Sequence, residues 1–213
     1  MATEDTAVTE AGAAPAEKPA GKAEKAPAEL LIGSGQRINR NPTDISFWAL
    51  VAEDYRTNGS KLASCGFWAL FVHRYGNWRF NVKNRLLAFP LNALFRLMFD
   101  FVRFFFGIQL SVETQVGRRV ILLHHGGMYL GAAKIGDGVL LKQNTTMGYR
   151  IGGDYGLPTL EDNVEVGTGA AILGAVTIGH DSFVAANSLV LKDVPPNSIA
   201  MGVPARAFPK LDE

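Results

Sequence analysis

The C-terminal half of the chain repeats every six residues, and this repeat limits the possible fold more than any other feature of the sequence. At that spacing the positions from 160 to 190 are all aliphatic: Leu160, Val166, Ile172, Ile178, Val184 and Val190. The positions four residues after each are small or β-branched: Val164, Ala170, Val176, Ser182, Ser188 and Val194. The register continues upstream at Ile135, Leu141 and Met147, and at Val116 and Leu122. Such a repeat predicts a β-solenoid, whose units bury their apolar faces by stacking.

An ordinary β-sheet is the alternative explanation of these aliphatic residues. Its side chains alternate with a period of two, which does not predict the small residue that follows the aliphatic one at Gly136, Gly167, Gly179 and Ala185. We therefore expect a mainly β solenoid. The repeat stops between Met147 and Leu160 at a glycine-rich stretch, which predicts a loop over residues 149–159 projecting from a corner.

The region before the solenoid divides into two parts. Residues 1–40 begin with a segment rich in Ala, Glu, Lys and Pro that has neither aromatic residues nor the features of an export signal, so we expect a disordered tail. Residues 41–106 show apolar residues at helical spacing, and Thr43 or Asp44 can cap the first helix. We therefore expect an α-helical lobe over 41–106, then the β-helix and a C-terminal tail over 107–213.

The most apolar helical segment runs from Leu86 to Phe106. Arg96, Asp100 and Arg103 interrupt it at spacings that gather the charges on one face, and three charges in mid-span disfavour a membrane-spanning helix. We expect this helix to cover the first coils of the solenoid or to form contacts between subunits. Peripheral contact with a membrane through its basic, aromatic-rich face stays open as an alternative.

The overall composition excludes several classes of function. With 21 basic and 20 acidic side chains the net charge is +1, so no general field would attract nucleic acid. The single cysteine, Cys65, cannot form an intramolecular disulfide, and this fits a reducing compartment. We expect a cytoplasmic protein, with the inner face of the membrane as the alternative location.

Several stretches together resemble a known family. "FFFGIQLSVETQVGRRVILLHHG", "KIGDGVLLKQNTTMG" and "NSLVLKDVPPNSIAMGVPAR" are similar to the hexapeptide-repeat acyltransferases, in particular the serine-acetyltransferase branch. The resemblance implies a left-handed parallel β-helix, a homotrimer with sites shared between subunits, and acetyl-CoA as co-substrate. The run from "LASCGFWALFVHRYGNW" to "VGRRVILLHHG" most resembles acetyltransferases of colanic-acid-type exopolysaccharide synthesis.

The sequence departs from the serine-acetyltransferase pattern around the acceptor. His124 stands where the branch has an aspartate, Gln109 where it has the aspartate that orients the base, and Leu157 where it has a histidine, while "RTNGSK" replaces an Arg-Asp-Pro motif. A pocket stripped of carboxylates would not pair with the ammonium of serine. We therefore expect transfer to a sugar hydroxyl of an exopolysaccharide or its precursor. Serine acetylation is the alternative, and a non-catalytic solenoid scaffold is a second one.

His125 matches the catalytic histidine of the family and is our candidate general base for direct transfer. The competing interpretation is a histidine packed in the solenoid wall. His124 should point to the opposite face if the segment is extended, where it would contact the acceptor, contact a neighbouring subunit or be purely structural. Opposite faces also disfavour a shared metal, so we expect none. Backbone N–H groups near Gly148 are candidates for stabilising the oxyanion.

The resemblance also implies the residues that bind acetyl-CoA. Thr168 and Ala186 match positions that contact the pantetheine arm, and Lys192 and Arg206 match positions near the nucleotide phosphates. A cation can pair with a phosphate. The alternative for Lys192 and Arg206 is an exposed charge without a ligand.

Overall fold

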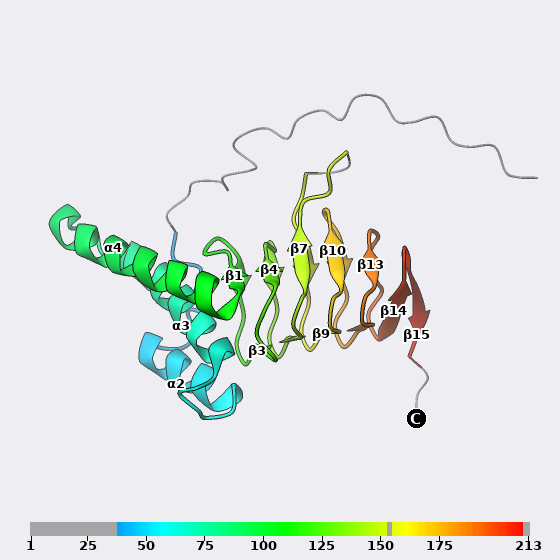
Figure 1. Ribbon diagram of the computed structural model, residues 1–213, viewed down its shortest axis with the longest axis horizontal. Helices are drawn as coiled ribbons and strands as arrows, with labels where there is room; N and C mark the ends of the chain where they lie inside the picture. Colours follow the sequence, from blue (N-terminus) through cyan, green and yellow to red (C-terminus); the bar gives the residue numbers. More distant parts are fainter. Residues whose placement is uncertain (1–37, 153–154, 211–213) are drawn as a thin grey trace, which may run out of the picture.

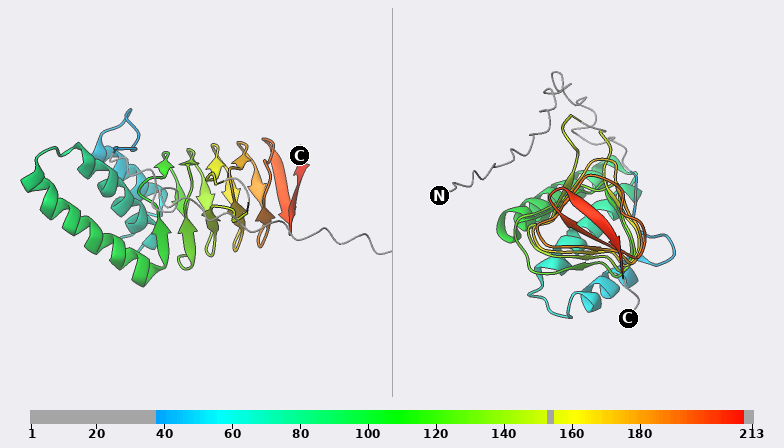
Figure 2. Two further views of the ribbon diagram at one scale, coloured as in Figure 1. Left: turned by 90° about the horizontal axis from the view of Figure 1, so that it is seen from above. Right: turned by 90° about the vertical axis from the view of Figure 1, so that its right-hand side faces the viewer.

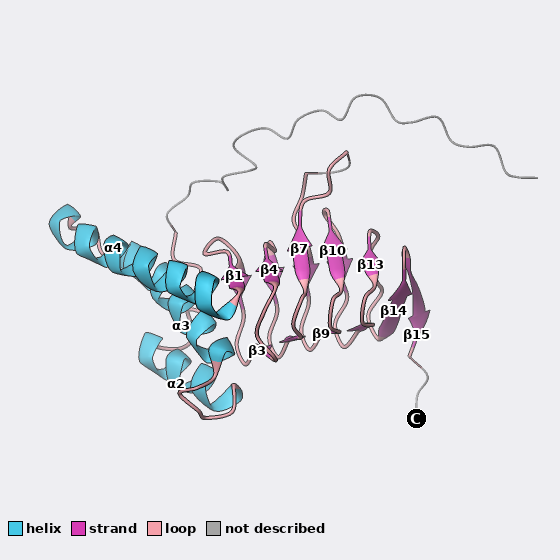
Figure 3. Cartoon of the chain, viewed as in Figure 1, coloured by secondary structure: helices cyan, strands magenta, loops and turns pink. Residues whose placement is uncertain are grey.

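The computed structural model describes residues 38–152 and 155–210, and it has helices at one end of a long β-helix (Figures 1 and 3). Most of the predicted disordered tail, residues 1–37, lies outside the described residues. The expected combination of a β-helix with an N-terminal helical region is confirmed.

The helical region consists of α2 (Phe47–Thr57), α3 (Cys65–Trp78), the 3-10 helix η1 (Arg79–Asn81), α4 (Arg85–Phe101) and the π-helix η2 (Val102–Phe106). The prediction of a cap at Thr43 or Asp44 was wrong, because Ser46 caps α2 by accepting a hydrogen bond from the N–H of Ala49. Asp44 instead forms an ion pair with Arg118 at 2.7 Å. Among the described residues, no helix is long and apolar enough to cross a membrane.

The β-helix is built from three sheets whose strands follow one another around each coil. The first sheet contains β1 (Ile108–Leu110), β4 (Met128–Leu130), β7 (Thr146–Gly148), β10 (Ala171–Leu173) and β13 (Leu189–Val190). The second contains β2 (Gln115–Val116), β5 (Lys134–Ile135), β8 (Thr159–Leu160) and β11 (Thr177–Ile178). The third contains β3 (Ile121–Leu122), β6 (Leu140–Leu141), β9 (Glu165–Val166), β12 (Phe183–Val184), β14 (Ser198–Gly202) and β15 (Ala205–Pro209). Pairing is parallel except between β14 and β15.

The predicted inward positions form the core of this β-helix. Leu160, Val166, Ile172, Ile178 and Val184 are fully buried, and Val190 is 1% exposed. Leu160 pairs with Ile178, three repeats later, so each six-residue unit supplies one side of a coil (Figure 2).

A steric restriction explains why a small residue follows the inward aliphatic residue. A Cβ atom added at Gly167 would lie 2.6 Å from the backbone nitrogen of Ala186 in the next coil. Only a residue without a side chain allows the coils to approach so closely at this point.

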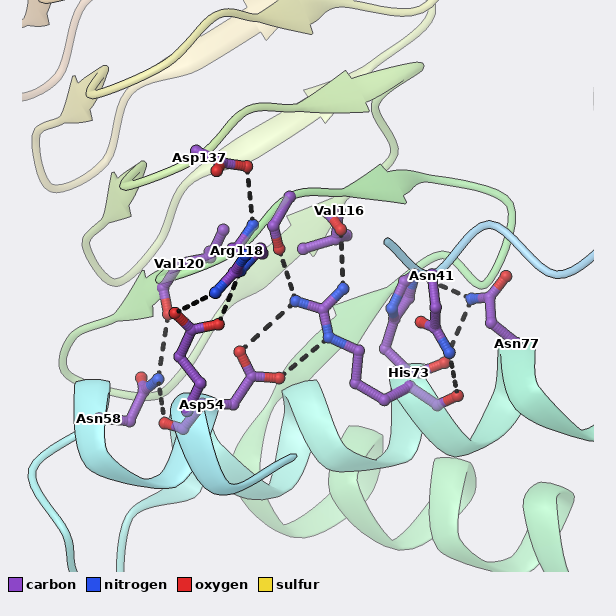
Figure 4. Close-up of polar contacts among 12 residues, drawn as sticks. Asn41, Asp54, Asn58, His73, Asn77, Val116, Arg118, Val120 and Asp137 are labelled. Atoms are coloured by element: carbon purple, nitrogen blue, oxygen red, sulfur yellow. Dashed lines mark hydrogen bonds and ion pairs between the residues drawn. The ribbon is translucent and has the colours of Figure 1, made fainter. Parts of the chain in front are cut away.

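Buried and half-buried polar groups fix the helices to the first coil of the β-helix (Figure 4). Arg74 on α3 forms an ion pair with Asp54 on α2 at 2.9 Å, and its guanidinium also donates to the carbonyls of Val116 and Gly117 at 2.7 and 2.6 Å. The Asn58 side chain donates to the carbonyl of Val120 at 3.0 Å and accepts from the N–H of Leu122 at 3.1 Å. The Asn58 bonds hold β3, and Leu123 separates this strand from the paired histidines.

Candidate active site

His124 and His125 lie in the turn between β3 and β4, and both side chains are exposed. Strand β3 ends at Leu122, and His124 has a φ of 53°, in the left-handed region. The segment is therefore not extended at His124, so the condition under which the two side chains were expected to alternate does not hold. Both imidazoles lie at the surface and outside the packed interior of the solenoid.

The His125 ring lies near the end of the helical region. Its centroid is 6.5 Å from that of Phe106, the last residue of η2, with 66° between the ring planes. Within the described ranges, no hydrogen bond or ion pair joins either imidazole of the pair to another side chain. The ring is accessible to an incoming hydroxyl group.

The turns at this corner stack along the axis of the solenoid. The N–H of Asn144 donates to the carbonyl of Gly126 at 3.0 Å, that of Gly169 to Gln143 at 3.0 Å, and that of Asn187 to Thr168 at 2.8 Å. Thr168, partly exposed, and Ala186, exposed, therefore lie on the same edge of the β-helix as His125. An extended ligand following this edge would meet all three residues.

Lys192 and Arg206 come together in a second place, a cleft of about 530 Å³ beyond the other end of β13. Arg150, in the projecting loop, lines the same cleft. Asp193 also lines it, and this carboxylate accepts a hydrogen bond from the N–H of Thr177 at 2.7 Å. In residues 38–152 and 155–210 none of the three cations forms an ion pair. The cleft can accept a phosphorylated group.

Sequence reasoning missed Arg150. It belongs to no repeat, and its only signal was its position in the projecting loop. Within one chain, the predicted pantetheine contacts lie apart from the predicted phosphate contacts, because Ala186 precedes β13 and Lys192 follows it.

A third site is a cavity of about 340 Å³ beside α4 and the first sheet. It brings together three positions singled out in the sequence, Gln109, Gly148 and Leu157. The full lining is Phe95, Phe99, Gln109, Ser111, Val112, Glu113, Tyr129, Leu130, Gly131, Gly148, Tyr149 and Leu157. The histidine pair is not part of this lining.

The half-buried Glu113 lines this cavity, so the cavity contains a carboxylate although Gln109 and Leu157 carry none. Burial raises the pKa of the Tyr149 phenol, and the nearby Tyr129 and Glu113 raise it further. The three side chains therefore interact electrostatically within one cavity. Sequence reasoning missed Glu113 because only the fold brings its turn against Phe95 and Phe99 of α4.

The described part of the chain contains no cluster of three or more His, Cys, Asp or Glu residues that would hold a metal ion. His124 and His125 are adjacent, but a structural zinc site takes four ligands. Metal ligation therefore has no support from the arrangement of these side chains.

No family model matches the sequence. Among curated proteins, the serine acetyltransferase of Mycobacterium tuberculosis is 35% identical over 146 residues, which are 67% of this chain and 60% of that protein. The serine acetyltransferase of Bacillus pumilus is 34% identical over 148 residues, 68% of this chain and 64% of that protein. The chain thus spans less than two thirds of the length of these relatives.

Solved structures show the same similarity. Serine acetyltransferase from Brucella abortus superposes with a TM-score of 0.62 at 25% identity, covering 77% of this chain and 68% of that one. A serine acetyltransferase in complex with CoA gives 0.61 at 25% identity, covering 76% and 70%. The Neisseria gonorrhoeae enzyme in complex with serine gives 0.58 at 25% identity, covering 75% and 68%.

These similarities overturn the expected exopolysaccharide acceptor. The curated relatives at 33–35% identity are serine acetyltransferases. The expectation rested on the missing carboxylates around the acceptor and on the resemblance of two stretches to exopolysaccharide acetyltransferases, and these relatives do not support it.

Proposed function

We propose, from its membership of the hexapeptide-repeat acyltransferases with a left-handed β-helix, that this chain transfers the acetyl group of acetyl-CoA to the hydroxyl of L-serine. The observation that carries the proposal is the similarity to serine acetyltransferases over about two thirds of the chain, 67% in the Mycobacterium tuberculosis comparison. The match to a structure containing CoA supports the donor, and the match to one containing serine supports the acceptor.

His125 is the proposed general base. Its exposed imidazole accepts the proton of the serine hydroxyl as the oxygen attacks the thioester carbonyl. The new C–O bond replaces the C–S bond, and the proton passes to the departing thiolate. Donors near the carbonyl oxygen would stabilise the charge that develops there, and backbone N–H groups near Gly148 remain the candidates. His124 is proposed to contact the acceptor or a neighbouring subunit.

The cavity with Glu113 is the proposed acceptor pocket. Its carboxylate would pair with the ammonium of serine, and the amide of Gln109 and the hydroxyl of Ser111 would donate to the serine carboxylate. This arrangement replaces the family's aspartates with a carboxylate from a different position. Serine could therefore bind although His124, Gln109 and Leu157 differ from the residues that serine acetyltransferases have at these positions.

The donor would occupy the stacked turns and the cationic cleft. Thr168 and Ala186 are proposed to contact the pantetheine arm, and Lys192, Arg206 and Arg150 to pair with phosphates. The three cations suit a ligand with several phosphate charges. If these cations are instead exposed charges without a ligand, replacing them should leave the affinity for CoA unchanged.

We also propose that the active form is a homotrimer. In one chain the proposed pantetheine contacts and the phosphate cleft lie at opposite ends of β13, and the cavity with Glu113 does not include His125. Contacts between neighbouring copies would bring these parts together. Light scattering of the active protein should give three times the mass of the chain.

The test measures CoA release from acetyl-CoA with and without L-serine, together with CoA binding by calorimetry. Turnover that requires L-serine supports the proposal. CoA binding without turnover of L-serine would reject the acceptor, and absence of CoA binding would reject the enzyme and favour a non-catalytic scaffold.

A further inference from the structure

One side of α4 and η2 exposes a continuous apolar stripe. The exposed positions 86, 90, 93, 97, 101 and 104 follow one another at spacings of three or four, which puts them on one face of a helix. Leu86 is 84% exposed, Leu97 69% and Phe104 82%, and Phe89, beside this row of positions, is 78% exposed. The opposite side packs against the protein through Leu91, Phe95, Met98, Phe99, Val102 and Phe106. The stripe is therefore not part of the monomer's core.

Aromatic rings concentrate at the C-terminal end of this stripe. The rings of Phe101 and Phe105 are 4.7 Å apart, and those of Phe104 and Phe105 are 5.1 Å apart, yet Phe105 is still 64% exposed. An apolar cleft of about 420 Å³ opens beside them between α3 and α4. Its lining is Trp68, Val72, Leu97, Met98, Phe101, Val102 and Phe106. A hydrocarbon chain is the kind of ligand that suits such a lining.

The charges bordering the stripe are mostly positive. Residues 83–106 contain Lys83, Arg85, Arg96 and Arg103 and a single acid, Asp100, which leaves three net positive charges. Asp100 is already paired with Arg103 at 3.1 Å. A second copy presenting the same face would bring no free anion to Arg85 or Arg96. A surface rich in anionic groups would supply counter-charges.

We propose that the exposed face of α4 and η2 binds the surface of a membrane containing anionic lipids. The helix lies along the surface, since no described helix is long and apolar enough to cross a bilayer. The rings of Phe101, Phe104 and Phe105 enter the acyl boundary, while Arg85 and Arg96 pair with lipid phosphates. In Figure 1, the N-terminal end of α4 projects beyond the other helices, and its C-terminal end lies beside β1.

Vesicle flotation of the intact chain tests the proposal. We expect the protein to float with vesicles containing phosphatidylglycerol and to bind at least tenfold less to vesicles of phosphatidylcholine alone, with binding weakened by salt. The variant Phe104→Ser with Phe105→Ser should lose at least tenfold in binding. Arg85→Gln with Arg96→Gln should lose the preference for anionic lipid.

The matched control is Trp48→Ser, which removes an aromatic residue that is 72% exposed on α2. It should float as the unaltered chain does, and circular dichroism of every variant should match. Absence of flotation with anionic vesicles, or unchanged flotation of the phenylalanine variant, overturns the proposal. If the phenylalanine variant instead lowers the mass measured by light scattering without any vesicle binding by the intact chain, the stripe is a contact between copies.

Discussion

The carboxylate of Asp54 lies 2.9 Å from Nε of Arg74, and both side chains are completely buried. The two residues belong to α2 and α3, and the same guanidinium donates to two carbonyls of the first coil. One cation therefore connects both helices to the β-helix. The Arg74 charge has been removed from water, so the folded state is stable only while the guanidinium keeps all of these partners.

Asp54→Asn should lower the free energy of unfolding by about 3–5 kcal/mol, because it leaves the Arg74 charge buried without its counter-ion. Urea unfolding followed by circular dichroism measures this loss. The control is Asp44→Asn, since Asp44 is 61% exposed and its pair with Arg118 is open to solvent. That variant should lose about 1 kcal/mol or less. Equal losses in the two variants would refute the special role of the buried pair.

Stability should fall with acidification partly because of His73. Burial, and then the nearby Arg74 charge, lower the pKa of His73 to about 3 from 6.5. The unfolded chain therefore binds a proton that the folded chain excludes as pH falls below 6.5. The contribution of His73 to the free energy of unfolding is complete above that pH. It declines by about 1.4 kcal/mol per pH unit as the pH falls towards the folded-state pKa of about 3.

Urea unfolding midpoints between pH 7 and pH 4 test this slope. His73→Gln retains a donor for the carbonyl of Thr114, which Nε2 of His73 meets at 3.0 Å. It removes the titrating group, so its stability should fall less over the same range. Parallel curves for both proteins would assign the acid sensitivity to other groups, such as carboxylates.

The six-residue repeat was enough to predict the solenoid and its core, because each inward aliphatic reports directly on one side of a coil. Leu160 and Ile178 were thus identified as core positions from spacing alone. The direction of the His124 side chain could not be predicted, since it depends on a left-handed backbone angle within a turn. The cavity with Glu113 also escaped prediction, because α4 closes it and the repeat says nothing about where that helix packs.

The cationic cleft predicts a selective loss of donor affinity. Arg150→Ala and Lys192→Ala should each raise the KM for acetyl-CoA by about tenfold, which corresponds to one charge-assisted contact. The KM for acetyl-pantetheine, which lacks the nucleotide phosphates, should not change. Lys134→Ala, an exposed lysine on β5, is the control. Equal effects on both donors would argue against phosphate contact.

Glu113→Gln should raise the KM for L-serine by about tenfold or more, with little change in kcat, if its carboxylate pairs with the substrate ammonium. The variant should also discriminate less against 3-hydroxypropanoate, which has the hydroxyl and carboxylate of serine without the ammonium. Glu161→Gln is the control, because Glu161 accepts from the N–H of His180 and does not line the cavity. An unchanged KM for L-serine in Glu113→Gln would remove this residue from the acceptor site.

The paired histidines predict different losses when each is removed. His125→Ala should lower kcat by about 10²-fold or more if its imidazole is the general base, and His124→Ala should cost less. Light scattering should show the same mass for both variants, because both side chains are exposed and lie outside the core. The pH dependence of kcat/KM adds a second readout, since the acidic limb of the profile should disappear only in the variant that lacks the base. A larger loss of kcat in His124→Ala, together with loss of that limb, would transfer the role of base to His124.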